Sequence, residues 1–324
     1  MASDTIKKSK RLHQMIGDAN TIAIIGHIHP DGDCIGSTMA MYNYIIDNYE
    51  GKTIQVYAEE FSPDFMIING TDKINHTATD KRYDLAISLD VSTLERMGDF
   101  REIYNSAIST ICIDHHVSNE GFGDLCYVSP SASSACEALC DLIDLEKVSL
   151  NTATSLFLGI VHDTGVFRYS CTGRRTMELA GLFMSMGVNS EQIIDDTFFK
   201  KTRRQNLLGA RVMTESKLLL DNRLIFGIVT SDLFEEMKCT KMDTDGIVEQ
   251  LRQTDGVEVS LFAYQLSDKK FKYSLRAKAK VDVNKVATTF GGGGHVKAAG
   301  FESEKPYEEV LATVAELVKA QLDG

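Results

Sequence analysis

Four groups of histidine and aspartate residues stand where predicted secondary-structure elements end. The segment 27–33, HIHPDGD, follows the apolar run 21–25, and Asp90 follows the run 84–89. The other two groups are Asp114-His115-His116, after the run 108–113, and His162-Asp163, after an apolar helical run. Imidazole and carboxylate together suit manganese, iron, cobalt or zinc, whereas magnesium prefers oxygen ligands alone. These residue types therefore predict a metal site.

The spacing of these residues predicts two ions. His27 and Asp31 flank a turn that Pro30 and Gly32 make tight, so both side chains can fold back to one ion. A second ion can be held, partly through a bridging carboxylate, by Asp33, Asp90, His115 and Asp163. Two divalent ions about 3.5–4 Å apart form a clamp for in-line displacement at phosphorus and lower the pKa of a bridging water. This arrangement favours hydrolysis of a phosphoester.

Short apolar runs alternate with helical patterns through the first half of the chain. Strands are predicted over 21–25, 53–57, 84–89 and 108–113, and helices over 36–48, 133–144 and 150–161. This alternation is typical of an α/β domain with a doubly wound, mainly parallel sheet and helices on both faces. In such sheets ligands bind beyond the carboxyl ends of the strands. One aspartate after a strand is more often a turn or cap residue, but four groups at one sheet edge favour a metal centre.

The second half of the chain predicts a smaller α/β domain with a mixed sheet. Its strands are expected over 223–230, 257–266 and 271–277, and its helices over 282–290 and 306–322. A polar stretch with helical spacing separates the two halves. We therefore predict a domain over 1–190, a helical linker over 191–216 and a second domain over 217–324, with a cleft between the domains.

Composition restricts the partners of this 324-residue chain. Its formal net charge of −12 argues against binding long duplex nucleic acid, although a local site can still hold a short phosphorylated substrate. The seven cysteines include no CxxC pair, which indicates free thiols in a reducing cytoplasm. No apolar run approaches the ~20 residues of a membrane span, and the N-terminus lacks the apolar core of a signal peptide. We therefore expect a cytoplasmic protein without membrane contact.

The motifs resemble, in order, those of the DHH phosphoesterase superfamily. HIHPDGDCIGS at 27–37, Asp90, the DHH triplet at 114–116 and HDTGVFR at 162–168 match the motifs of its catalytic domain. GGGGH at 291–295, followed by AAG at 298–300, is similar to the motif of the DHH-associated substrate-binding domain. The resemblance covers nearly the whole chain. The length and architecture of the chain are similar to those of the superfamily branch whose members hydrolyse nanoRNA and 3′-phosphoadenosine 5′-phosphate (pAp).

The resemblance implies a role for each motif residue. One manganese ion would be held by His27, Asp31 and Asp90, and a second by Asp33, Asp90, His115 and Asp163. Magnesium and cobalt are the alternatives to manganese. His116 would face the phosphate, and Asp114 would orient the histidine pair from behind. Relatives often have asparagine at the position of His29, so its role stays open, including an exchange of ligand role with His27.

The second domain carries candidates for binding the substrate. The run 291–294 leaves the backbone free to adopt positive φ and expose N–H groups to a phosphate. The stretch 271–280, FKYSLRAKAK, is the most basic in the chain. An unbroken strand would place Lys270, Lys272, Arg276, Lys278 and Lys280 on one face, although lysines also guard solvated edge strands. Arg276 is the preferred phosphate contact, because relatives share the SLR sequence and arginine grips phosphate bidentately.

Two residues of the first domain complete the candidate substrate site. Arg168 lies in the HDTGVFR motif, and Ser134 precedes a predicted helix, where serine is more often only an N-cap. The substrate-binding candidates are thus Arg276, Gly292, Gly293, Gly294, His295, Arg168 and Ser134. The catalytic candidates are His116, Asp90 and Asp114.

The resemblance implies a metal-dependent phosphoesterase that hydrolyses short oligoribonucleotides, of about two to five nucleotides, to 5′-mononucleotides. It also implies pAp 3′-phosphatase activity. Enzymes of the same fold could instead hydrolyse pApA or cyclic di-AMP, or pyrophosphate or polyphosphate. The GGGGH motif argues against the pyrophosphatase alternative. A nucleotide sensor without catalysis would be expected to lose a ligand carboxylate, and none is missing. A homodimer is expected only because homodimers are common among soluble proteins.

Overall fold

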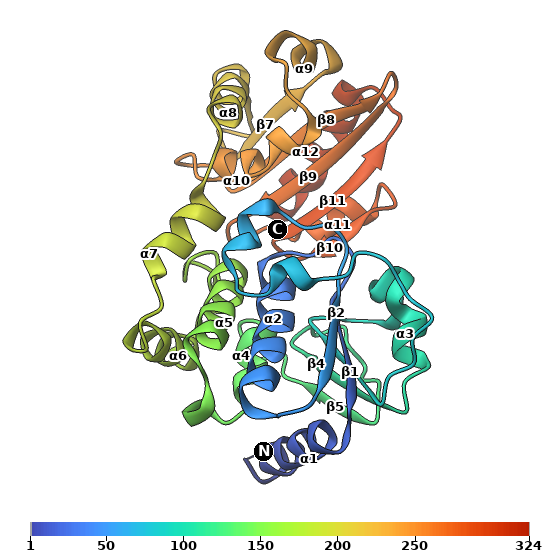
Figure 1. Cartoon of the computed structure of the whole chain (residues 1–324). Coiled ribbons are helices and arrows are strands. Elements are labelled where there is room, and N and C mark those ends of the chain that lie inside the picture. Colours follow the sequence, from blue (N-terminus) through green and yellow to red (C-terminus); the bar gives the residue numbers. More distant parts are fainter. Residues whose placement is uncertain (1, 324) are drawn as a thin grey trace. The chain divides into compact units, whose positions relative to one another are not determined.

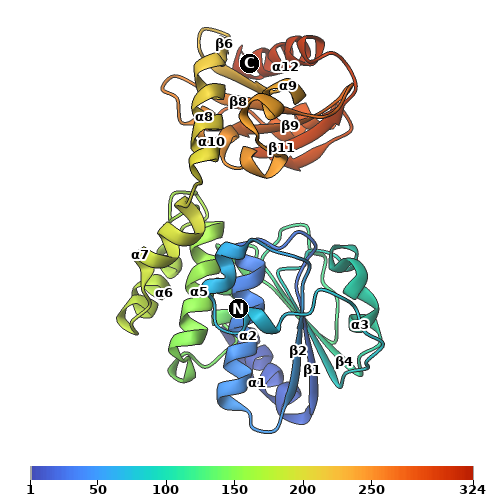
Figure 2. The same cartoon turned by 45° about the horizontal axis from the view of Figure 1, so that its top comes forward.

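The computed structural model describes residues 2–323, which form two compact units that divide between Lys200 and Lys201. Figures 1 and 2 show the helices and strands of both units in two orientations. Each unit has its own sheet and its own apolar core. No helix within residues 2–323 combines the length and apolar character needed to pass through a bilayer.

The first unit is built on a five-stranded sheet in the order β2-β1-β3-β4-β5, with all neighbouring strands parallel. The strands are β1 Thr21–Ile25, β2 Thr53–Tyr57, β3 Leu85–Leu89, β4 Ser109–Asp114 and β5 Leu125–Val128. The central strands read as continuous apolar runs because a parallel sheet is covered on both faces. The doubly wound parallel sheet predicted from the sequence is confirmed. The edge strand β5 was not predicted, because its four residues are too few to show a period.

Helices cover both faces of this sheet. In Figure 1, α2 (Gly32–Asn48), α4 (Ala135–Cys140) and α5 (Leu150–Asp163) lie on one face, and α3 (Arg101–Asn105) lies on the other. The remaining helices of the unit are α1 Ala2–Asp18, α6 Arg174–Ser185 and α7 Ser190–Ile193. The larger core packs α2, α4 and α5 against β1 and β3. A smaller core lies under α3.

Two glycines let α2 and α5 cross at close range. A Cβ on Gly36 would lie 2.7 Å from the carbonyl oxygen of Ser155 and 2.8 Å from the amide nitrogen of Gly159. A Cβ on Gly159 would lie 2.5 Å from Oδ1 of Asp33. Neither helix can carry a side chain at these positions without moving its neighbour. The crossing therefore places the first turn of α2, with Asp33, against the helix that ends at Asp163.

Residues 191–216, predicted as a helical linker, form three short elements. These are the end of α7, a π-helical turn over Ile194–Phe199 and α8 (Arg203–Glu215). Leu208 and Val212 of α8 are buried in a core of the second unit. This amphipathic packing places α8 inside the second unit, so the units divide between Lys200 and Lys201.

The second unit contains a six-stranded mixed sheet in the order β10-β11-β9-β8-β7-β6. Only β7 and β8 pair in parallel, and the other pairs are antiparallel. The strands are β6 Lys217–Leu219, β7 Leu224–Val229, β8 Val259–Ser267, β9 Lys270–Ala277, β10 Gly293–His295 and β11 Ala298–Ser303. The helices besides α8 are α9 Ser231–Met237, α10 Ile247–Arg252, α11 Val283–Thr288 and α12 Tyr307–Asp323. The predicted mixed-sheet domain is confirmed.

The basic stretch of the second unit is a strand only as far as Ala277, which agrees with the strand predicted over 271–277. Exposure alternates along β9, with Lys272 exposed and its neighbours Phe271 and Tyr273 buried. The strand ends at Ala277, because the carboxylate of Glu258 accepts the backbone amides of the residues that follow, 279–281. Lys278 and Lys280 would share a face with Lys272 only in an unbroken strand, and the strand ends before them.

The N-terminal end of the first sheet depends on one carboxylate. Asp84 precedes β3, and its Oδ2 accepts the backbone amides of Asn20 and Thr21 at 2.9 Å each. These hydrogen bonds, with that of Thr21 the largest cause, lower the pKa of Asp84 below its ordinary value of 3.8. The stabilisation is therefore present above that ordinary value and is lost as the pH falls through the lowered pKa of the folded state.

We expect Asp84→Asn to lower the melting temperature at pH 7 and to leave it nearly unchanged near pH 2. Thermal unfolding of the wild type and the variant across this pH range measures the difference. An equal difference at both ends of the range would contradict the role of the Asp84 carboxylate.

Candidate metal centre and active site

The loop between β1 and α2 positions two of the predicted ligands. Asp31 is the N-cap of α2, and its Oδ1 accepts the backbone amides of Asp33 and Cys34 at 3.0 and 3.1 Å. This cap holds the carboxylate 3.7 Å from Nε2 of His27. The cap therefore explains why the carboxylate four residues after His27 returns to the same site.

The tautomer of His27 follows from its surroundings. The ring is 5% exposed, and its Nδ1 lies 2.8 Å from the carbonyl oxygen of Ile28 and 3.2 Å from a guanidinium nitrogen of Arg96. A carbonyl can only accept, so the shorter contact places the proton on Nδ1. The lone pair of Nε2 then points to Asp31 and to Oδ2 of Asp90, which lies 3.3 Å away. A histidine held in this way presents Nε2 to a metal.

Asp90 lies at the centre of the cluster. It directly follows β3, is 3% exposed and has a φ of 60°, a left-handed conformation that costs free energy in a non-glycine residue. Its Oδ2 faces His27, and its Oδ1 lies 3.5 Å from Nε2 of His115. Oδ1 is buried and accepts no hydrogen bond from the described residues. One carboxylate thus stands between two histidines with an oxygen directed to each.

Asp33 is held by the amino end of α4. Its side chain is fully buried, and its Oδ2 and Oδ1 accept the backbone amides of Ala135 at 2.6 Å and Cys136 at 3.1 Å. The backbone amides that begin a helix favour a negative charge. The same carboxylate lies 3.8 Å from Nε2 of His115. The fixed amides therefore set its orientation toward the cluster.

His115 and Asp163 complete the cluster from β4 and α5. His115 follows the last residue of β4, and its Nε2 lies 3.1 Å from Oδ2 of Asp163, the last residue of α5. Among residues 2–323, three sets of side chains have ligand atoms that all lie within 4.8 Å of one another. These sets are His27, Asp31 and Asp90; Asp33, His115 and Asp163; and Asp90, His115 and His116. The structure thus brings together all six predicted ligands, and their role as ligands stays a prediction.

His116 is oriented differently from the other two histidines. Its Nδ1 lies 2.8 Å from Oδ1 of Asp114, whose Oδ2 accepts Nδ2 of Asn119 at 2.7 Å. Nδ1 therefore carries a proton that it donates to Asp114, which leaves Nε2 for another partner. The hydrogen bond to Asp114 raises the pKa of His116, although burial opposes the shift. His116 thus suits proton transfer better than metal binding.

The electrostatics of the cluster fit divalent cations. Burial, followed by repulsion from Asp90, raises the pKa of Asp33 well above its ordinary value. Burial likewise raises the pKa of Asp163 to about 6. Buried carboxylates that repel one another are stabilised by a bound cation, and the unpartnered Oδ1 of Asp90 offers a free ligand atom. The mixed nitrogen and oxygen donors suit manganese, iron, cobalt or zinc.

His29 lies apart from the cluster. Its side chain is 86% exposed, and its Nδ1 lies 3.4 Å from Oε2 of Glu59, which also accepts the His29 amide at 2.8 Å. The residue has a φ of 55°, so the backbone turns its ring away from the position of His27. His27, and not His29, groups with Asp31 and Asp90.

The two substrate candidates of the first unit differ in access. Ser134 is fully buried, and its Oγ accepts the Glu137 amide at 3.0 Å as the N-cap of α4. This position suits capping and not direct contact with a substrate. Arg168 is exposed and follows a left-handed turn over residues 165–167. Arg168 therefore remains a candidate.

The glycine run of the second unit forms a hairpin and not an open loop. Gly293 and Gly294 lie in β10, opposite Gly300 and Ala299 of β11. A Cβ on Gly292 would lie 2.2 Å from the carbonyl oxygen of Gly300, so close packing explains this glycine. Within the run only the first and last glycines have positive φ, which corrects the expectation of a continuous series of exposed amides.

The other predicted residues of the second unit lie near this hairpin. Arg276 in β9 pairs with Ala298 of β11, and His295 at the end of β10 pairs with the same residue and is exposed. Arg276 and His295 thus lie on the two strands that flank β11, and the end of the glycine run lies on the same strand as His295.

Several residues of the candidate site were not predicted from the sequence. Asn119 holds Asp114, and Arg96 lies beside His27. The Ala135 and Cys136 amides bind Asp33, whereas the sequence indicated only Ser134, the residue before them, as part of the site. Asn119 follows the DHH triplet closely enough to be considered. Contacts of backbone amides, and of a residue 69 positions away in sequence, depend on the tertiary fold.

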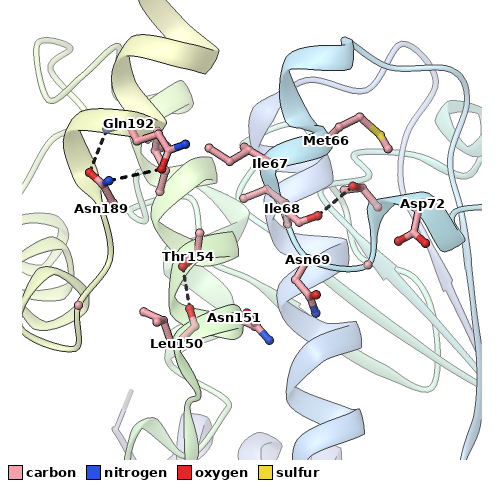
Figure 3. Close-up of a pocket in the computed structure, with 14 residues that line it drawn as sticks. Met66, Ile67, Ile68, Asn69, Asp72, Leu150, Asn151, Thr154, Asn189 and Gln192 are labelled. Carbon is pink, nitrogen blue, oxygen red and sulfur yellow. Dashed lines mark hydrogen bonds between the residues drawn. The ribbon is translucent and has the colours of Figure 1, made fainter.

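A separate pocket of about 600 Å³ lies elsewhere in the first unit. Figure 3 shows Asn151 and Thr154 at the start of α5, with Asn189 and Gln192 above them and Ile68 and Asn69 on the other side. None of the metal-site candidates lines this pocket. The metal centre is therefore distinct from it.

Comparison with known proteins identifies both units. The DHH family, N-terminal domain, matches residues 21–160, and the DHHA1 domain matches residues 227–323. The bifunctional oligoribonuclease and PAP phosphatase NrnA of Thermus thermophilus is 30% identical over 315 residues, which cover 91% of this chain and 89% of that protein. The probable enzyme of the same name from Streptococcus mutans is 29% identical over 306 residues, 90% of this chain and 94% of that one.

A solved structure shares the fold. An exopolyphosphatase-related protein from Bacteroides fragilis has a TM-score of 0.88 to this chain at 23% identity, covering 97% of this chain and 96% of that one. The matching domains, the relatives and the gathered DHH motif residues agree. The chain therefore belongs to the DHH family of metal-dependent phosphoesterases.

Proposed function

We propose that this chain hydrolyses short oligoribonucleotides to 5′-mononucleotides and removes the 3′-phosphate of pAp, in the cytoplasm and with manganese. The observation that carries this proposal is the gathering of six histidine and aspartate side chains, Asp90 among them, in one cluster. It is supported by relatives along about 90% of the chain that are named bifunctional oligoribonucleases and PAP phosphatases.

The proposed metal ligands divide into two sets that share Asp90. One set is His27, Asp31 and Asp90, and the other is Asp33, Asp90, His115 and Asp163. When bound, two divalent ions neutralise phosphate charge and lower the pKa of water. The chain contributes a fixed Nε2 on His27 and an Asp33 that α4 already orients, so little rearrangement is needed for loading.

His116 is proposed to donate the proton to the leaving oxygen. Its Nδ1 is occupied by Asp114, so Nε2 is the atom that would carry this proton. The raised pKa of His116 keeps more of the ring protonated near neutral pH. Asp114 and Asn119 act through His116 by fixing its orientation.

We expect Asp114→Asn to lower kcat about 10- to 100-fold and to change its pH dependence. An acid must be protonated, so activity falls as the pH rises through the pKa of His116. Loss of the Asp114 anion lowers that pKa toward its ordinary value of 6.5, which moves the alkaline limb of the profile to lower pH. The measurement is kcat against pH for both proteins. An alkaline limb that stays in place would exclude His116 as the proton donor.

The second unit is proposed to hold the nucleotide part of the substrate. Arg276 and the exposed His295, on the two strands that flank β11, offer cationic and hydrogen-bonding groups to a phosphate. Arg168 offers a further cation in the first unit. A unit that grips a terminal phosphate favours short substrates over long ones.

A substrate panel with manganese tests this function. It contains RNA of two, five and about 24 nucleotides, pAp, pApA, cyclic di-AMP and pyrophosphate. We expect fast release of mononucleotides from the two shortest RNAs, release of phosphate from pAp, and slow cleavage of the long RNA. Equal rates across all RNA lengths, or cleavage of pyrophosphate alone, would overturn the proposal.

A further inference from the structure

Two cysteines of the first unit face each other on neighbouring strands. Cys112 of β4 pairs in register with Cys126 of β5, and both are free thiols. Paired residues of adjacent strands point to the same face, and strands lie about 4.7–4.9 Å apart. This spacing is within the Cα separation of about 4.4–6.8 Å that a disulfide spans. The interaction between the two thiols raises the pKa of Cys112 and lowers that of Cys126.

Only one of the two thiols is accessible. Cys112 is buried, whereas Cys126 is half-buried and lines a pocket of about 480 Å³ beside Lys8 and Phe122. The hydrogen bond from Cys112 lowers the pKa of Cys126 to about 6, and the Lys8 ammonium acts in the same direction. A thiolate is the reactive form of cysteine, so this pocket gives small oxidants access to a nucleophile.

Asn119 connects the cysteine pair to the proton donor. Its Nδ2 lies 3.5 Å from Sγ of Cys112 and 2.7 Å from Oδ2 of Asp114. Asp114 in turn accepts the proton of His116 at 2.8 Å. A change in the position of the Cys112 sulfur therefore acts on the residue that orients His116.

We propose that Cys126 and Cys112 form a peroxide-driven disulfide that slows the enzyme by displacing Asn119. The Cys126 thiolate attacks hydrogen peroxide, which forms the S–O bond of a sulfenic acid and releases hydroxide. The Cys112 sulfur then attacks the Cys126 sulfur, which forms the S–S bond and, with the thiol proton, releases water. A thiol reductant reverses the reaction.

The formation of the disulfide is independent of the substrate, and only its effect on activity rests on the proposed function. The manganese-loaded protein is treated with hydrogen peroxide, desalted and supplied again with manganese. Peptide mapping by mass spectrometry, without reduction, is expected to show a peptide that links Cys112 to Cys126. Hydrolysis of a dinucleotide is expected to fall about 10-fold and to recover with dithiothreitol.

Two variants locate the effect. Cys126→Ser is expected to keep the untreated activity and to lose the peroxide sensitivity, whereas Cys171→Ser removes an exposed thiol and keeps the sensitivity. Thermal unfolding checks that each variant is folded. Sensitivity that follows Cys171, or the absence of the linked peptide in the treated wild type, would overturn the proposal. A linked peptide in a protein with no hydrolytic activity would support the disulfide and contradict the proposed function.

Discussion

Asp90→Asn is expected to lower kcat at least about 1,000-fold, which corresponds to about 4 kcal/mol of transition-state stabilisation. Asp90 lies between His27 and His115, with Oδ2 directed to the first and Oδ1 to the second. Asparagine has nearly the same shape but loses the charge and one of the two oxygen ligands. Turnover of a dinucleotide and the number of bound manganese ions per chain measure the effect.

Asp84→Asn is the matched control for this variant. Asp84 and Asp90 flank the same strand, β3, at its opposite ends. Asp84 binds backbone amides at the start of β1, whereas the cluster follows the ends of β1 and β3. Its replacement therefore costs stability but is expected to leave turnover at 25 °C unchanged. An Asp90→Asn protein that is folded and retains wild-type turnover would exclude Asp90 from the catalytic centre.

Gly159→Ala is expected to lower kcat about 100-fold and to destabilise the first unit by about 1–3 kcal/mol. The added methyl group would lie 2.3 Å from Sγ of Cys136 and 2.5 Å from Oδ1 of Asp33. Asp33 is held by the amides of α4, so a shift of α5 or α2 must pull it from its place beside His115. Thermal unfolding and dinucleotide turnover measure the two effects.

Gly181→Ala is the control for the glycine substitution. Gly181 also lies inside a helix, α6, but it is exposed and a Cβ there would meet no atom within 4 Å. Alanine at such a site is expected to stabilise the protein by about 0.5–1 kcal/mol with unchanged turnover. If Gly159→Ala behaves like Gly181→Ala, the close crossing of α2 and α5 does not position Asp33.

The strands and candidate ligands that could be predicted are those marked by a pattern of neighbouring residues in the sequence. The run 21–25 is continuous and apolar, and His27 follows it directly, so both the strand and the start of the site could be recognised. Local pattern does not separate His27 from His29, and the preference for His27 rests on the family resemblance. In the structure His29 has a left-handed backbone and an exposed side chain. Local pattern therefore predicts which elements form, and backbone conformation decides which side chain enters the site.

Contacts that depend on packing were not predictable. Gly159 gives no signal in a single sequence, yet it determines how closely α5 approaches Asp33. The glycine run at 291–294 suggested an open loop, but it pairs with β11, a strand that has no clear pattern in the sequence. The contact between Asn119 and Asp114 forms through the fold of the loop after β4, so the sequence alone does not predict it.

Anomalous diffraction at the manganese edge, from crystals grown with manganese, locates the bound ions. We expect two peaks that share Asp90, one beside His27 and Asp31 and one beside His115 and Asp163. The matched Asp90→Asn crystals are expected to lose at least one peak. No peak at this cluster in the wild type, or peaks that avoid Asp90, would contradict a two-metal phosphoesterase.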